Sequence, residues 1–228
     1  DPRALVVSET HVDDRRPLDE WGHDAQWCDE HHHALHVLLT GEGEGYYEPY
    51  GKVEQLARAL ERPERERLVV FAQNHDQVGN RASGDRLRRD QLRVAAHCTL
   101  LSPSTPLLFM GEEHGEERPF QFFTDHIDPA VAEATRRGRR DDFAGFPGFA
   151  AGDIPDPQDP ATFEGSRLAP ERGDAALRDC YRELLRLRRD LPPEVEVEFT
   201  EEPRRLRLRR GELELAVDFE RLSAEIRR

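Results

Sequence analysis

The sequence of 228 residues contains no apolar stretch that approaches the roughly 20 residues needed to cross a lipid bilayer. Its first residues, Asp1-Pro2-Arg3, do not resemble the opening of a secretory signal peptide. We therefore expect neither a membrane span nor an export signal in this chain.

Cysteine is scarce, and its three occurrences, Cys28, Cys98 and Cys180, lie far apart. An odd number of cysteines without a paired motif argues against a disulfide framework and against a zinc ribbon. We therefore expect free thiols, a reducing cytoplasmic environment and no structural metal.

An excess of positive charge is also missing, because 47 acidic residues stand against 33 basic ones and the net charge is -14. This balance disfavours binding to nucleic acid or to an anionic membrane. Hydrophobic residues make up 36% of the chain and charged residues 35%, which is lean for a large core but far from a disordered composition. The composition indicates a globular chain with a heavily charged surface.

What the sequence does contain is a dense polar cluster directly after an apolar run. Residues 68–71 read Leu-Val-Val-Phe, and residues 73–80 read Gln-Asn-His-Asp-Gln-Val-Gly-Asn. In a parallel α/β barrel the strands are apolar on both faces, and the residues just beyond their carboxyl ends line the substrate mouth. The pattern therefore predicts a site that contains Asn74, His75 and Asp76.

A second apolar run, residues 4–7, is followed by Ser-Glu-Thr-His, so that Glu9 is a second carboxyl group at a strand end. Two carboxyl groups on one barrel rim are what glycoside hydrolysis requires. From the pattern alone, ordinary roles for Glu9 and Asp76 in turns or helix caps stay open.

The apolar spacing predicts four barrel-type strands, at residues 4–8, 24–27, 68–73 and 106–110. It also predicts three helices: one capped by Asp29 and stopped at Gly41, one opened by Asp85 or Asp90 and broken by Ser102-Pro103, and one over residues 174–190. A complete eight-stranded barrel takes about 250 residues. We therefore expect half a barrel over residues 1–192, with two open sheet edges that another segment has to cover.

After Pro193 the apolar period changes to two, which predicts three antiparallel strands with a tight turn at Arg210-Gly211. Residues 193–228 should thus form part of a small β-sandwich domain. The segment between residues 141 and 170 is rich in glycine and proline, and we expect no regular element there, only a functional loop or a linker.

The chain resembles the malto-oligosyltrehalose trehalohydrolase family of the α-amylase superfamily (glycoside hydrolase family 13). The likeness runs from Ser8 to about Arg189 and is carried by residues 24–27, 32–36, 39–42, 45–47, 73–81, 107–113 and 155–160. It implies an α/β fold, the C-terminal half of a (β/α)8 TIM barrel with strands five to eight. It also implies a retaining hydrolase that releases trehalose from maltooligosyltrehalose by cleaving the α-1,4 bond next to the terminal trehalose unit.

The resemblance assigns a role to each polar residue of the predicted site. Glu9 matches the general acid/base and Asp76 the transition-state stabiliser. His75 is implied to bind the hydroxyls of the sugar at the cleavage point. The remaining sugar-binding residues are then Asn74, Gln77, Trp27 and Asp24, and Trp27 could present a flat face to a pyranose ring.

No residue matches the nucleophilic aspartate of the family, which follows strand four. The resemblance therefore implies an isolated chain that binds maltooligosaccharide without turnover and needs an N-terminal barrel half. Another α-amylase-superfamily enzyme (branching or debranching), an inactive carbohydrate-binding fragment and an interaction protein on a decayed barrel remain alternatives.

Two further features concern ligands and specificity. His32 and His36 lie one helical turn apart and could share a zinc ion, but no third ligand is evident, and packing or hydrogen bonding is favoured. The family carries this histidine run without a catalytic metal, so we expect no metal and no cofactor. The connector at residues 61–66 is shorter than the Tyr-, Ser- and Arg-bearing segment of the family, which lies near the trehalose end of the cleft.

Overall fold

The computed structural model describes residues 4–10, 14–143 and 154–228. Its first part is built on a four-stranded parallel sheet with the strand order β1-β2-β3-β4. The strands are β1 (Val7–Ser8), β2 (Ala25–Trp27), β3 (Leu68–Val70) and β4 (Thr105–Pro106). Each overlaps a predicted strand but is shorter. Beyond β4 the ladder continues only through the bond from Leu107 N to Val70 O, at 2.8 Å.

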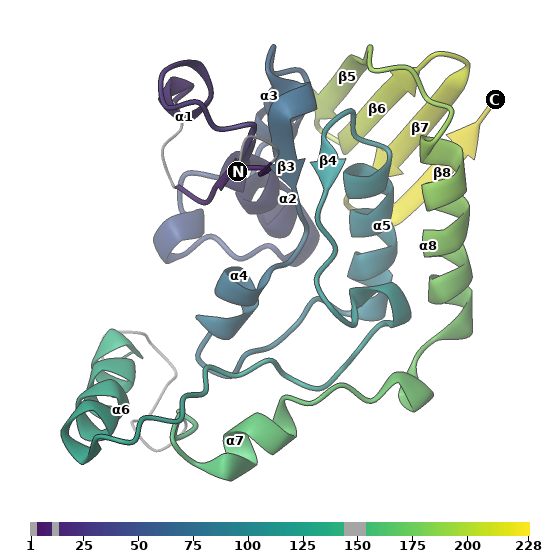
Figure 1. Ribbon diagram of the computed structural model, residues 1–228. Helices are drawn as coiled ribbons and strands as arrows, with labels where there is room; N and C mark the ends of the chain where they lie inside the picture. The colour runs from purple at the N-terminus through teal and green to yellow at the C-terminus, as the bar shows by residue number, and fades with distance from the viewer. Residues whose placement is uncertain (1–3, 11–13, 144–153) are drawn as a thin grey trace.

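Helices lie between and after these strands along the chain. They are α1 (Arg16–Asp19), α2 (Asp29–Thr40), α3 (Val53–Leu60), α4 (His75–Gly79), α5 (Arg89–Leu100), α6 (Pro129–Phe143), α7 (Pro160–Gly165) and α8 (Ala175–Arg188). Figure 1 shows α6 and α7 away from the sheet. Short 3₁₀ turns lie at η1 (Gly45–Tyr47), η2 (Arg65–Arg67), η3 (Glu112–His114) and η4 (Pro170–Arg172). The buried residues of α2, α3, α5 and α8 form one continuous core.

The predicted helix starts are off by a residue or more. Cys28, not Asp29, is the N-cap of α2, whereas Gly41 ends this helix in the left-handed region as expected, with φ of 77°. At α5 the capping side chain is Gln91, whose Oε1 accepts from Arg88 N at 2.9 Å. Asp90 lies in the first turn instead. A carboxylate there interacts favourably with the positive end of the helix dipole.

The C-terminal part is a four-stranded antiparallel meander made of β5 (Glu196–Glu201), β6 (Arg204–Arg210), β7 (Leu213–Asp218) and β8 (Ser223–Arg227). The prediction of three strands missed β8, whose inward residues Ala224 and Ile226 are only partly buried and give a weak alternating pattern. The turn after β6 is where it was expected, with Gly211 at φ of 58°.

The barrel part and the meander share one core. An arginine from each part bonds to the turn that follows α5, and Arg210 is the one that links the meander to the barrel. Arg188 of α8 donates to the carbonyls of Leu100, Ser102 and Ser104 at the end of α5. Arg210 of β6, with 4% of its surface exposed, donates to carbonyls of the same turn, from Leu101 and Ser102, and to Pro192 O. The boundary at residue 192 stays a prediction.

The expectation that residues 141–170 hold no regular element is wrong for the described part. Helix α6 reaches Phe143, and α7 forms over Pro160–Gly165, while residues 144–153 lie outside the described residues. Asp159 caps α7 by accepting from Ala161 N at 2.8 Å. Proline is favourable at a first helical position, because the N–H that it lacks would have no partner there.

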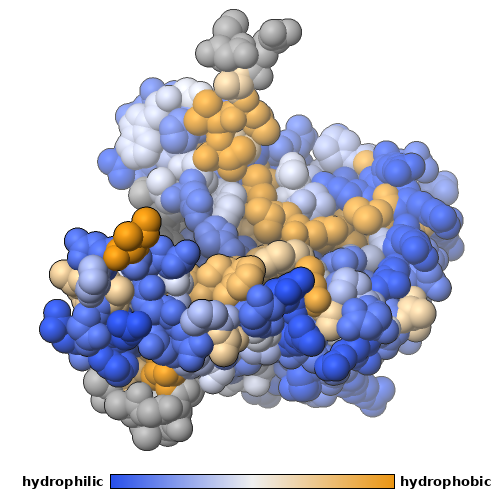
Figure 2. All heavy atoms as spheres, turned by 60° about the horizontal axis from the view of Figure 1, so that its bottom comes forward, coloured by the Kyte–Doolittle hydropathy of each residue, from blue (hydrophilic) through white to orange (hydrophobic). Residues whose placement is uncertain are grey.

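The two outer strands of the parallel sheet are paired on one side only. Figure 2 shows a band of apolar surface across one face of the molecule. The exposed large apolar residues include Leu5, Val6 and Val7 around β1 and Leu108 and Met110 after β4. The half barrel therefore leaves apolar surface uncovered at both of its edges, as expected.

Candidate active site

The carboxyl ends of β1, β2 and β3 bring three of the predicted residues together. Because the strands are parallel and in register, Glu9 after β1, Trp27 at the end of β2 and His75 after β3 lie at the same edge of the sheet. Glu9 Oε1 is 3.8 Å from His75 Nε2, and both side chains are more than half exposed, at 57% and 60%. The Trp27 ring meets the His75 ring edge-on, with centroids 6.1 Å apart. A carboxylate, an imidazole and an indole thus share one accessible rim.

Asp76 lies in the first turn of α4, directly beside His75. Asn74 is the N-cap of this helix, and its Oδ1 accepts from Gln77 N at 2.6 Å. Asp76 Oδ1 accepts a hydrogen bond from Asn80 Nδ2. The carboxylate of Asp76 is therefore held by a hydrogen bond within its own helix.

Asn74 differs from its neighbours in being buried, with 1% of its surface exposed. Its oxygen is used by the helix cap, and its Nδ2 has no hydrogen-bond partner within the described residues. Asn74 therefore fixes the start of α4, directly before His75.

The structure does not bring Asp24 to this rim. Asp24 precedes β2, at the opposite end of that strand from Trp27, and its Oδ2 accepts from Val6 N at 2.8 Å. Residues 24–27 form one motif in the sequence, but Asp24 precedes the strand and Trp27 ends it, so the two lie at opposite ends of β2.

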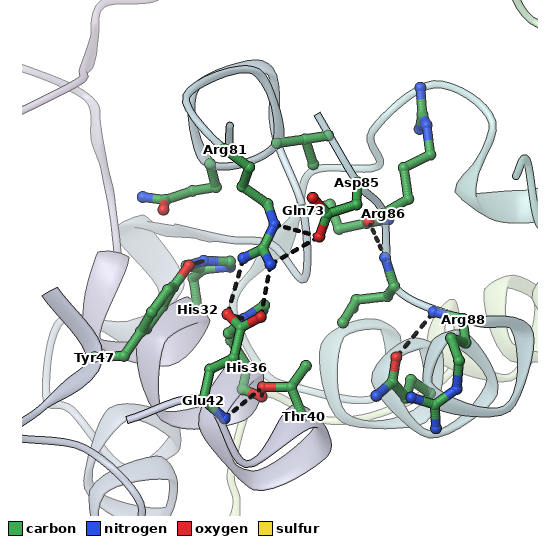
Figure 3. Close-up of a pocket in the computed structure, with 14 residues that line it drawn as sticks. His32, His36, Thr40, Glu42, Tyr47, Gln73, Arg81, Asp85, Arg86 and Arg88 are labelled. Carbon is green, nitrogen blue, oxygen red and sulfur yellow. Dashed lines mark hydrogen bonds and ion pairs between the residues drawn. The ribbon is translucent and has the colours of Figure 1, made fainter. Parts of the chain in front are cut away.

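Gln77 faces a neighbouring cavity of about 250 Å3, between α4, the end of α2, η1 and the start of α5 (Figure 3). Glu42 in its wall accepts from His36 Nε2 at 2.7 Å and from both terminal nitrogens of Arg81, at 2.9 and 2.6 Å. Arg81 Nε also donates to Asp85 at 2.8 Å. The hydrogen bonds from His36 and Arg81 hold the pKa of Glu42 well below its usual range. The charges of Glu42, Arg81 and Asp85 are thus paired with one another.

The histidine run serves hydrogen bonding and packing. Burial lowers the pKa of His32 well below its usual value, so the ring is neutral and carries one proton. Its Nδ1 is 2.8 Å from Ala72 O, which can only accept, so that Nε2 accepts from Tyr47 Oη at 3.1 Å. Burial raises the pKa of Tyr47 to about 12, which keeps this hydroxyl protonated. His32 therefore fixes the backbone just before the polar cluster.

Metal binding has no support at this run. Both ring nitrogens of His32 are engaged, and Nε2 of His36 is bonded to Glu42. Among residues 4–10, 14–143 and 154–228, no group of three or more His, Cys, Asp or Glu residues is placed to hold a metal ion.

The same described residues include no helix long and apolar enough to cross a membrane.

Sequence reasoning missed Glu112, which lies on η3 behind the rim. It is 2% exposed, and Tyr181 Oη donates to its Oε1 at 3.4 Å. Burial raises the pKa of Glu112 to about 8, so this carboxyl group is largely protonated at neutral pH. In the sequence, Glu112 stands next to Glu113 and His114 and is therefore typical of a surface residue. The feature that could have pointed to it is its position in residues 107–113, one of the segments that carry the family resemblance.

The amino-acid sequence was compared with family models and with curated proteins. No family model matches the chain. The malto-oligosyltrehalose trehalohydrolase of Arthrobacter ramosus is 41% identical over 93% of this chain and 44% of its own length. The enzyme of the same name from Saccharolobus solfataricus is 35% identical over 82% of this chain and 37% of its own length. Over most of its length the chain is thus similar to part of the malto-oligosyltrehalose trehalohydrolases.

The chain spans less than half the length of the curated relatives that it matches. The alignment with the Arthrobacter ramosus enzyme runs over 252 positions, more than the 228 residues of the chain. The relative therefore carries residues that have no counterpart here, and the shortened connector at residues 61–66 stays a prediction.

Solved structures confirm the fold class. A Salmonella typhimurium protein whose name refers to alpha amylase superposes with a TM-score of 0.72 at 34% identity, over 92% of this chain and 42% of that one. A debranching enzyme from Nostoc punctiforme superposes with a TM-score of 0.56 at 15% identity, over 94% and 40% of the two chains, and supports the fold alone. The parallel sheet and the meander thus correspond to half of an α-amylase-type barrel with its C-terminal β domain.

Proposed function

We propose that this chain supplies two of the three active-site carboxylates of a retaining glycoside hydrolase that releases trehalose from maltooligosyltrehalose. Glu9 is the general acid/base and Asp76 stabilises the transition state. The nucleophilic carboxylate comes from a barrel half outside residues 1–228. The contact of 3.8 Å between Glu9 and His75, across the ends of β1 and β3, is the observation that carries the proposal.

The proposed reaction is a double displacement. Glu9 gives its proton to the glycosidic oxygen between the glucan and the trehalose unit while the nucleophile attacks the anomeric carbon. Glu9 then takes a proton from water, and that water releases the glucan from the enzyme. Asp76 lies where positive charge develops on the sugar ring, and a fixed carboxylate there lowers the barrier.

The substrate is held by neutral contacts as well as charged ones. Trp27 presents an aromatic face next to His75, which suits the apolar patches of a pyranose ring. His75 is free to bond sugar hydroxyls because more than half of its side chain is exposed. Asn74 caps α4 by accepting from Gln77 N, and the side chain of Gln77 lines the neighbouring cavity. We also propose a cytoplasmic location, in keeping with the three free cysteines.

Incubation of purified chain 1–228 with maltooligosyltrehalose and with starch tests the missing nucleophile. Binding should be detectable by calorimetry and weakened by Trp27→Ala, while release of trehalose and of glucose stays at background. Hydrolysis by the isolated chain would contradict the proposal. Absence of any glucan binding would favour an interaction protein on a decayed barrel.

A further inference from the structure

Helix α4, which carries His75 and Asp76, is too short to be stable alone. It has five residues, and isolated helices of this length do not form in water. Asn74 caps its N-terminus. Its last carbonyl groups need partners from elsewhere, and a helix C-terminus favours a cation.

Arg139 of α6 supplies these partners. Its Nη2 donates to Gly79 O at 2.9 Å and to Arg81 O at 2.7 Å, and its Nη1 donates to Asn80 O at 3.3 Å. Three successive carbonyls at the end of α4 are therefore held by one planar group.

The guanidinium of Arg139 is shielded from water, with 8% of the residue exposed. It lies over the rings of Phe122 and Phe143, at 5.2 and 4.7 Å from their centroids. Aromatic faces attract a desolvated cation, so these rings hold the donor group in place above α4.

Helix α6 makes little other contact with the rest of the molecule. Arg139 and Ala132 are its only buried residues among those described. Figure 1 shows α6 beyond α4, away from the parallel sheet and the meander. Arg136, one turn earlier on α6, pairs instead with Asp156 at 2.9 Å.

We propose that Arg139 is a positioning residue, which fixes the C-terminal end of α4 and thereby the direction in which His75 and Asp76 face the rim. The inference rests on the proposed function for its catalytic meaning. Its structural part, the coupling of α6 to α4, stands independently of that function.

Residue-resolved hydrogen exchange on chain 1–228 tests this coupling with Arg139→Met. Methionine keeps an unbranched apolar side chain but removes every N–H donor of the guanidinium. The amides of Val78 and Asn80, which bond to Asn74 O and Asp76 O within α4, should exchange at least about tenfold faster. Arg139→Lys, which keeps the charge, should restore part of the protection. Arg136→Met is the matched control and should leave α4 unchanged.

The affinity for maltooligosyltrehalose, measured on the same variants, separates this inference from the proposed function. Arg139→Met should weaken binding by about tenfold, with amide exchange in the strands β6 and β7 unchanged. If the unmodified chain binds no glucan, the proposed function fails, and the exchange rates alone decide the coupling. Unchanged exchange in α4, equal acceleration throughout the chain, or unchanged affinity in a chain that binds glucan would overturn the positioning role.

Discussion

Glu112 lies on η3 with its carboxyl group shielded from water, and burial raises its pKa to about 8. In the unfolded chain a glutamate titrates near pH 4.3. The folded state therefore holds this proton more tightly, and the associated stability is complete below about pH 4 and is lost progressively as the pH rises to about 8.

Replacement of Glu112 by Gln removes this titration while keeping the shape of the side chain. Relative to the unmodified chain, we expect the free energy of unfolding of Glu112→Gln to be larger at pH 8 than at pH 5 by about 2–5 kcal/mol, so that the variant gains relative stability as the pH rises. Urea unfolding at the two pH values measures this difference. Glu117→Gln, an exposed acid nearby, should show no such gain, and an equal effect of Glu112→Gln at both pH values would refute a buried neutral carboxyl group.

The predictable residues of the site are those that directly follow an apolar strand. Glu9, Trp27 and His75 could be brought together from the sequence because parallel strands end at one edge. The resemblance implies sugar binding by Asp24, but this residue directly precedes β2, whereas Trp27 ends the strand. Glu112 and Arg139 could not be found, because their burial depends on packing between segments far apart in the chain.

At the scale of elements, α4 depends on its two ends. Its N-cap is Asn74, and both Asn74→Ser and Asn74→Ala remove the buried amide nitrogen, but only serine keeps an oxygen that can accept from Gln77 N. We expect the alanine variant to be less stable than the serine variant by about 1 kcal/mol. Thermal or urea unfolding of the pair measures this, and equal stabilities would show that the cap contributes nothing.

The elements that were predicted poorly share a weak local signal. Helix α7 lies in a segment rich in glycine and proline, and its start depends on a single Asp-Pro cap. Strand β8 presents only small or partly buried residues to the sheet. In contrast, α8 carries strong apolar periodicity and lies within two residues of the predicted range 174–190, and the turn between β6 and β7 is at the predicted position.

At the scale of the whole molecule, Arg210 joins the meander to the barrel helices through buried carbonyl groups. Arg210→Met would leave these carbonyls without a donor, and we expect a loss of about 3 kcal/mol or more in the free energy of unfolding. Arg209→Met provides a matched control. Arg209 is the neighbouring residue, its side chain is half exposed, and its ion pairs with Glu196 and Glu214 lie at the surface, where such pairs contribute less than about 1 kcal/mol. Equal losses in the two variants would argue against a structural joint at Arg210.

Trehalose release by a joined protein tests the central claim most directly. Chain 1–228 is fused to the N-terminal barrel half of a relative, and trehalose is measured after incubation with maltooligosyltrehalose, for the fused protein and for its Glu9→Gln and Glu20→Gln variants. We expect release by the fused protein and by Glu20→Gln, and a loss of about 100- to 10,000-fold in Glu9→Gln, because glutamine cannot donate the proton. A fused protein that releases maltose from starch but no trehalose, or one that is indifferent to Glu9→Gln, would contradict the account.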